Sequence, residues 1–331
     1  MCSHKRYELT SNQPYFNHLD FITNVQANMR FHFSLATLPV QFHESVQDTI
    51  LLIVSGLQDC GHGVTIDNEK VKVDGSAINL MLEHFDEEAA ASVVATKLQK
   101  GDDFPLGIIF TENLTDQNVM AGNFASRTDN FKRVAEVADF LWYFIPGTDE
   151  NISVISPSKC FFFEVGYSDR YALAPIQEVR DIDFLLPGLT YPRRKPILEK
   201  LFALGYQVRS TDLTTPAYIY HNLIGRSKII LDIRRFEDTI NMSTIRVCNG
   251  ATNGITVIAE KFDTSKLGEL YDYTITTNYS NFVDCCVDTI EKLDPIEIGI
   301  KHKKMFMQNR PLKFYVEKLL TKDIFGPFEN A

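Results

Sequence analysis

Short apolar runs alternate with amphipathic segments through the second half of the chain. A run of four to eight apolar residues bounded by glycine or proline predicts a buried strand, and apolar positions three and four apart predict a helix. On this pattern we predict strands at 181–188, 206–209, 228–233 and 255–259, and helices at 194–204, 216–226 and 243–253. Because buried strands that alternate with helices are typical of a parallel sheet, this half is predicted to be α/β.

The first half shows the same alternation less regularly. Its apolar runs predict strands at 49–56, 105–111, 140–145 and 160–166, with a further apolar stretch at 77–85. Strong helix formers at 86–97 and an amphipathic pattern at 130–139 predict helices. Residues 1–45 are mixed, with short aromatic-rich segments, and no element is assigned there. We therefore predict a second parallel sheet.

The length of the chain suits two domains. A chain of 331 residues exceeds what one small core organises, and the proline-bearing segment 173–178 separates the two series of strands and helices. We predict an N-terminal domain at 1–178 and a C-terminal domain at 179–290. Helices near 300–308 and 312–322, within a tail at 291–331, are predicted to pack back on the first domain.

Composition and charge indicate a globular protein and argue against a membrane-spanning, secreted or zinc-binding one. The chain is 44% hydrophobic and 23% charged, as in globular proteins, and its net charge of −10 predicts no general attraction to phosphate backbones. No apolar run approaches the length of a membrane span, and no apolar segment follows the basic N-terminus as in a signal peptide. Six scattered cysteines without a CxxC pair favour a cytoplasmic protein with free thiols and no zinc site.

Common nucleotide and hydrolase motifs are absent from the sequence. Gly56, Gly61 and Gly63 have the wrong spacing for a dinucleotide fingerprint, and no Gly-Lys-Ser/Thr phosphate loop occurs. Gly-x-Ser-x-Gly, His-Glu-x-x-His and EF-hand patterns are also missing. These absences remove motif support for hydrolases, zinc proteases and calcium sites.

Three segments carry a resemblance to a known class of enzyme: residues 184–195, 218–228 and 243–260. Together they resemble the nucleotide-sugar half of GT-B glycosyltransferases, of the spore-maturation-like or family 1 type. The resemblance implies an α/β fold of two Rossmann-like domains facing across a cleft. It also implies transfer of a hexose or pentose from a nucleotide-diphosphate sugar, without a metal or other cofactor.

The resemblance assigns donor contacts to the second domain. Arg193, Arg194 and Lys195 precede a helix whose N-terminus would face the diphosphate, and guanidinium groups neutralise such a charge. Arg246 matches an arginine three residues before an acidic position of the family, but Asn249 replaces that acid and Asn241 the one before it. The resemblance still assigns Asn249 to the donor, as a weaker hydrogen-bond partner of a ribose hydroxyl than a carboxylate. The remaining candidates follow from position near the cleft: Tyr220 for stacking on the base, and Arg234 and Glu260 at strand ends. Arg235 stands beside Arg234 at the same strand end.

Two residues of the first domain are candidates for the acceptor side. Glu112 follows the strand predicted at 105–111, where a general base would be placed. His84 lies beside Glu83, and histidine is the side-chain type whose ordinary pKa is nearest neutrality. The loop between Gly56 and Gly63 resembles the glycine-rich first loop of the same enzymes.

Alternatives to this hypothesis stay open. Because the family acids are replaced by Asn241 and Asn249, the chain could be a non-catalytic GT-B scaffold or partner subunit. Another GT-B reaction, such as that of a sugar-phosphate epimerase or phosphorylase, is a second alternative. The acceptor is left open as a glycan, a small molecule or a modified base in phage DNA, although the acidic balance disfavours DNA.

Overall fold

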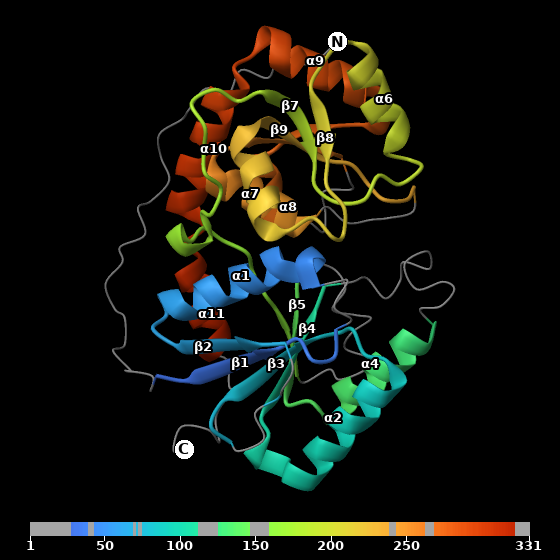
Figure 1. Ribbon diagram of the computed structural model, residues 1–331. Coiled ribbons are helices and arrows are strands. Elements are labelled where there is room, and N and C mark those ends of the chain that lie inside the picture. Colours follow the sequence, from blue (N-terminus) through green and yellow to red (C-terminus); the bar gives the residue numbers. More distant parts are fainter. Residues whose placement is uncertain are drawn as a thin grey trace.

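The structure consists of two parallel sheets, each covered by helices (Figure 1). It is a computed structural model, and it describes residues 28–38, 43–68, 71, 75–111, 125–145, 159–237, 243–261 and 268–321. Figure 1 shows the second sheet and its helices above the first. The predicted α/β class is confirmed.

The first sheet has six strands in the order β2-β1-β3-β4-β5-β6, and all neighbours are parallel. The strands are β1 (Arg30–Ser34), β2 (Gly63–Asp67), β3 (Ile78–Leu82), β4 (Leu106–Phe110), β5 (Phe140–Tyr143) and β6 (Cys160–Phe162). Helices α2 (Glu87–Lys100) and α4 (Ala125–Val137) cover one face, and α1 (His43–Asp59) with α11 (Leu312–Thr321) cover the other. Strands and helices predicted at 86–97, 105–111, 130–139 and 140–145 are confirmed.

The strand predicted at 49–56 is wrong, because these residues lie in the middle of α1. Leu52, Ile53 and Leu57 are fully buried there between the sheet and α11. A helix that is covered on most sides carries a nearly continuous apolar run, which periodicity does not distinguish from a buried strand. The glycine-rich loop predicted from Gly56 is shorter than expected, since the helix continues to Asp59.

The chain also contains a strand in the segment where none was predicted. The aromatic-rich stretch Arg30–Ser34 forms β1, which pairs with both β2 and β3 inside the sheet. Four of its five residues are buried, so its side chains pack on both faces of the sheet. Two of the buried residues, His32 and Ser34, are polar, and His32 Nδ1 lies 2.8 Å from Thr65 Oγ1 on the neighbouring strand.

The second sheet has five parallel strands in the order β11-β10-β9-β7-β8. The strands are β7 (Ile182–Leu186), β8 (Val208–Ser210), β9 (Ser227–Asp232), β10 (Thr256–Glu260) and β11 (Ile275–Thr277). Helices α6 (Lys195–Ala203) and α9 (Phe282–Lys292) cover one face, while α7 (Ala217–Arg226), α8 (Thr244–Asn253) and α10 (Pro295–Asn309) cover the other. All four strands and three helices predicted for this half are confirmed within two or three residues at their ends; β11 was not predicted.

The two halves share one continuous apolar core. A single cluster of buried residues includes Leu57 of α1, Ile224 of α7 and Val247 of α8. The C-terminal tail strengthens this connection, because α10 packs on α8 and β10 of the second sheet while α11 packs on α1 of the first. Between α10 and α11, Arg310 O accepts a hydrogen bond of 2.7 Å from the amide N–H of Tyr167. This bond joins the C-terminal tail to the segment between β6 and β7.

Candidate functional site

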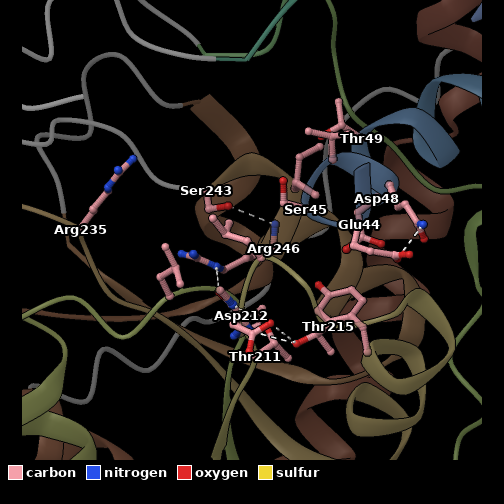
Figure 2. A pocket seen from close by; sticks show the side chains of 18 of the residues that line it. Glu44, Ser45, Asp48, Thr49, Thr211, Asp212, Thr215, Arg235, Ser243 and Arg246 are labelled. Carbon is pink, nitrogen blue, oxygen red and sulfur yellow. Dashed lines mark hydrogen bonds between the residues drawn. The ribbon is translucent and has the colours of Figure 1, made fainter. Parts of the chain in front are cut away.

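A cavity of about 430 Å³ lies where the carboxyl ends of both sheets meet (Figure 2). In open α/β sheets this edge is where ligands bind. The first half contributes the start of α1 and single residues that follow β3, β4 and β5. The second half contributes the segments after β7, β8 and β9 and the starts of α7 and α8. The side chains that line the cavity include Glu44, Asp48, His84, Thr111, Tyr191, Arg194, Tyr220, Asp232, Arg234, Arg235 and Arg246.

Arg246 is fixed at the first turn of α8, whose N-cap is Ser243. Its Nε donates to Pro187 O at 2.8 Å and its Nη1 to Asp232 Oδ1 at 2.7 Å. Gly188 lies against the same guanidinium with φ +101°, and a Cβ there would come within 3.2 Å of Arg246 Nη2. The guanidinium is therefore held rigidly beside the positive end of a helix, an arrangement suited to an anion.

Arg194 is the most buried cation of the cavity wall, with 5% of its surface exposed. Its Nε donates to Ile233 O at 2.9 Å and its Nη1 to Leu189 O at 2.7 Å, so its hydrogen bonds go to backbone carbonyls rather than to a carboxylate. Burial, followed by the nearby Arg246 charge, lowers the pKa of Arg194 to about 9. An anionic ligand would relieve both effects.

Arg235 also lines the cavity, and Figure 2 shows it on the side of Arg246 away from Asp48. Its guanidinium carbon lies 4.4 Å from the centre of the Tyr191 ring and 5.1 Å from that of Phe236. Its Nε is buried and has no hydrogen-bond partner among the described residues. Stacking therefore orients this guanidinium while leaving donors for a ligand.

Arg193, Arg234 and Glu260 form a compact ion cluster beside the main cavity. Glu260 is fully buried at the end of β10; it accepts two hydrogen bonds from Arg193, at 2.5 and 2.6 Å, and one from Arg234 Nε at 2.8 Å. Burial raises the pKa of Glu260, but the hydrogen bonds from Arg193 and Arg234 outweigh it and hold this pKa below the usual value. Arg234 lines the main cavity, and both arginines line a neighbouring one of about 510 Å³.

Lys195 lies apart from the other basic residues. Its side chain is 64% exposed and pairs with Glu199 one turn later in α6, with Nζ and Oε1 3.6 Å apart. It is not among the residues that line either cavity. The sequence placed Arg193, Arg194 and Lys195 together, but the geometry brings only Arg194 to the main cavity.

Tyr220 and Asn249 meet an acidic residue of the first half. Asn249 Nδ2 donates to Asp48 Oδ2 at 2.8 Å and lies 3.3 Å from Tyr220 Oη. His221 Nε2 lies 3.4 Å from Asp48 Oδ1. Burial, followed by the Asp48 carboxylate, raises the pKa of Tyr220 well above its usual value. Asp48 thus connects α1 with α7 and α8 across the cavity.

His84 lies on the wall opposite the arginines, directly after β3. Its Nδ1 is 3.8 Å from Oε1 of the buried Glu83, which also accepts a 2.6 Å hydrogen bond from Thr111 Oγ1. Burial is the main cause that raises the pKa of Glu83. Glu112, the other acceptor-side candidate, and Asn241 lie outside the described residues.

Solved structures of glucosyltransferases resemble this chain over nearly its whole length. An alpha-glucosyltransferase in complex with UDP and a 13-mer DNA with a central A:G mismatch has a TM-score of 0.59 at 9% identity, covering 89% of this chain and 99% of its own. The DNA modifying enzyme beta-glucosyltransferase has a TM-score of 0.55 at 10% identity, with the same coverage. The fold is of the GT-B type. No protein-family model and no curated protein sequence matches the chain.

The GT-B likeness establishes the architecture, and the site must be judged on its own residues. The spore-maturation-like subgroup stays a prediction. Among the described residues, no group of three or more His, Cys, Asp and Glu side chains is arranged to hold a metal ion. In the same part of the chain, every helix is too short or too polar to cross a membrane.

Sequence reasoning missed the acidic wall of the GT-B cavity. Glu44 and Asp48 lie one turn apart on α1 and both face the second half: Glu44 Oε2 accepts from Ala217 N at 3.1 Å. A spacing of four residues puts two side chains on one face of a helix, but the strand predicted at 49–56 kept this segment from being assigned as a helix. Only the correct assignment of α1 puts both carboxylates on one face.

Proposed function

We propose that this protein is a glycosyltransferase, which transfers a sugar from a nucleoside diphosphate sugar to an acceptor held in the cleft. One observation carries the proposal: Arg194, Arg235 and Arg246 converge on one wall of a cavity at the carboxyl ends of a parallel sheet. Two of them, Arg194 and Arg235, make no hydrogen bond to a carboxylate of the described residues. Such a wall suits a diphosphate, which carries its charge on several oxygens.

The same groups would act on the reaction itself. The bond between the anomeric carbon and the diphosphate oxygen breaks, and charge grows on the leaving nucleoside diphosphate. Guanidinium groups already held by Pro187, Asp232 and Tyr191 stabilise that charge without reorganising. Arg193 and Arg234 would position this wall rather than bind the diphosphate, because most of their hydrogen-bond donors are already bonded to Glu260.

We assign the acceptor to the first half of the cavity. The acceptor oxygen forms the new bond to the anomeric carbon, and its proton passes to the imidazole of His84. The Glu83 carboxyl group, 3.8 Å away, would orient that imidazole. Glu112 is the alternative base from the sequence and keeps that role as a proposal.

The donor and acceptor are proposed by chemical class. Solved structures of the same fold are described with UDP, with UDP-glucose and with DNA, so UDP sugars are the first donors to test. A glycan, a small molecule and a modified DNA base all stay candidate acceptors, and the net charge of −10 weighs against DNA. Described cysteines are all free thiols, which supports a location in the reducing cytoplasm.

Thermal unfolding in the presence of nucleotides tests the proposal. The panel contains nucleoside diphosphates and their sugars. A member that binds, at about 100 times its dissociation constant, should stabilise the protein against unfolding by about 2.7 kcal/mol. At the same ligand concentration the Arg246→Ala variant should be stabilised by about 1.4 kcal/mol or less, the value for a tenfold weaker affinity. A protein that melts cooperatively but responds to no member of the panel would not be a nucleotide-sugar enzyme.

A non-catalytic scaffold is the second candidate, and one observation favours it. Asn249 offers a neutral amide where the resembled enzymes have an acid, and this amide is engaged with Asp48 and Asn253. Release of UDP from UDP-glucose, with or without an acceptor, separates the two candidates. Donor binding without any release supports the scaffold, and analysis of the sugar product distinguishes transfer from an epimerase or phosphorylase reaction.

A further inference from the structure

Asp48 is a carboxylate of the first half that is held almost entirely by groups of the second half. Asn249 donates to its Oδ2 at 2.8 Å, His221 Nε2 lies 3.4 Å from its Oδ1, and the Tyr220 hydroxyl also hydrogen-bonds it. Within the described residues no lysine or arginine forms an ion pair with it, although its side chain is only 14% exposed. A carboxylate has about four acceptor sites, so this one keeps capacity for a further donor.

The surroundings of Asp48 point to a ligand that carries hydroxyl groups. Asp48 lines the main cavity together with Tyr220, whose hydroxyl hydrogen-bonds the carboxylate. Hydrogen bonds from a hydroxyl to a buried carboxylate are strong, because the acceptor is charged and little water competes. A cationic ligand is disfavoured by the neighbouring arginine wall.

The position of Asp48 relative to Arg246 selects among hydroxyl-bearing groups. Arg246 and Asn249 are three residues apart in α8, so their Cβ atoms are separated by roughly 5–6 Å on one helix face. Asn249 hydrogen-bonds Asp48, so the carboxylate stands beside the same helix as the Arg246 guanidinium, and both line one cavity. In Figure 2, Asp48 is on the opposite side of Arg246 from Arg235. A ribose is bonded directly to its phosphate, so a nucleotide whose phosphate binds Arg246 extends its ribose within this cavity toward Asp48.

We propose that Asp48 binds the ribose hydroxyls of the donor nucleotide from the opposite side of the cleft. The inference rests on the proposed function, since it takes a nucleoside diphosphate as the ligand. It gives the first half, through α1, a part in recognising the donor as well as the acceptor. Donor binding would then add a second contact across the same interface that Asp48, Asn249 and His221 already join.

Isothermal titration with UDP, 2′-deoxy-UDP and 3′-deoxy-UDP tests the inference. The wild-type protein should bind at least one deoxy analogue about tenfold more weakly than UDP, because a hydrogen bond to a charged group is lost. In Asp48→Asn this discrimination should largely disappear. Asp59→Asn changes a carboxylate at the far end of the same helix, outside the cavity wall, and it should keep the discrimination.

A double variant protects the test against a simple folding defect. Asp48→Asn combined with Asn249→Asp exchanges the carboxylate and the amide, so the hydrogen bond between them can re-form in the opposite direction. The double variant should recover the melting temperature of the wild type but not the discrimination, because position 48 still carries no carboxylate.

The outcomes separate this inference from the function on which it rests. If the wild type binds no nucleotide, both fail. If the wild type binds UDP but does not distinguish the deoxy analogues, or if Asp48→Asn distinguishes them as well as the wild type, the role of Asp48 is refuted and the proposed function stands. A loss of discrimination that appears only with UDP-glucose, and not with UDP, would assign Asp48 to the transferred sugar and refute the ribose contact.

Discussion

Arg193 and Glu260 are joined by two parallel hydrogen bonds of 2.5 and 2.6 Å, although 67 residues separate them in the chain. The carboxylate is fully buried, and Arg234 donates to it as well. We expect Glu260→Gln to destabilise the protein by about 3–5 kcal/mol, because it leaves two guanidinium groups without their counter-charge. Urea unfolding measures this loss.

A matched control for Glu260→Gln is Asp181→Asn. Asp181 also accepts two hydrogen bonds from one arginine, Arg226, but its side chain is 53% exposed. Because an exposed pair contributes little, the expected change is within about 1 kcal/mol. Equal losses in the two variants would contradict the importance of burial for the Glu260 cluster.

The same cluster predicts a dependence of stability on pH. Hydrogen bonds from Arg193 and Arg234 overcome the effect of burial and lower the pKa of Glu260 in the folded protein. Its contribution is therefore complete above the pKa of an unfolded glutamate, about 4.3, and is lost as the pH falls through the lower folded value. Unfolding free energy measured between neutral pH and acid should fall less steeply in Glu260→Gln than in the wild type.

Arg246 and Lys195 should differ sharply in donor binding. Arg246→Ala removes a preorganised guanidinium from the cavity, and we expect affinity for UDP to fall at least about tenfold, the effect of losing a charged hydrogen bond. Lys195→Ala removes an equal charge from an exposed helix face and should leave affinity nearly unchanged. Calorimetric titration of both variants is the measurement. A larger loss in Lys195→Ala would contradict the site described above.

His84 is expected to affect turnover more than binding. Its imidazole lies on the acceptor side of the cavity, so His84→Gln should lower kcat by about 10²–10⁴ while the Kd for the donor stays the same. His43→Gln is the control, since His43 lies at the start of α1 outside the cavity wall and bonds only the Leu38 carbonyl among the contacts of the described chain. Unchanged turnover in His84→Gln would transfer the role of base to Glu112.

Replacing Gly299 of α10 with alanine should destabilise the protein, although alanine favours helices in general. Alanine is a better helix former than glycine by about 1 kcal/mol, but a Cβ at position 299 would lie 2.4 Å from Gly254 O. We expect Gly299→Ala to destabilise the protein by about 1–3 kcal/mol through displacement of α10 from β10. Gly63→Ala, where a Cβ would find its nearest neighbour at 3.6 Å, is the control in the same thermal unfolding experiment.

The fold of the second half followed from local pattern. Strands β7, β9 and β10 are short runs buried on both faces, and helices α6, α7 and α8 between them have one apolar side, so each element carries its own signal. In the first half the same rule failed at 49–56. The apolar run there reflects the cover that α11 provides from more than 250 residues further along the chain, which no local window contains.

The sequence by itself determined which residues stand near the carboxyl ends of the second sheet, since Arg194, Arg234, Arg235 and Arg246 follow strands or begin helices. Only the tertiary structure decided which of these charges remain available to a ligand. Glu260 accepts hydrogen bonds from Arg193 and Arg234, and Asp48 accepts one from Asn249, which is 201 residues further along the chain. Such pairings depend on where the two sheets meet, and a contact between residues so distant is set by the packing of whole elements rather than by the spacing of residues.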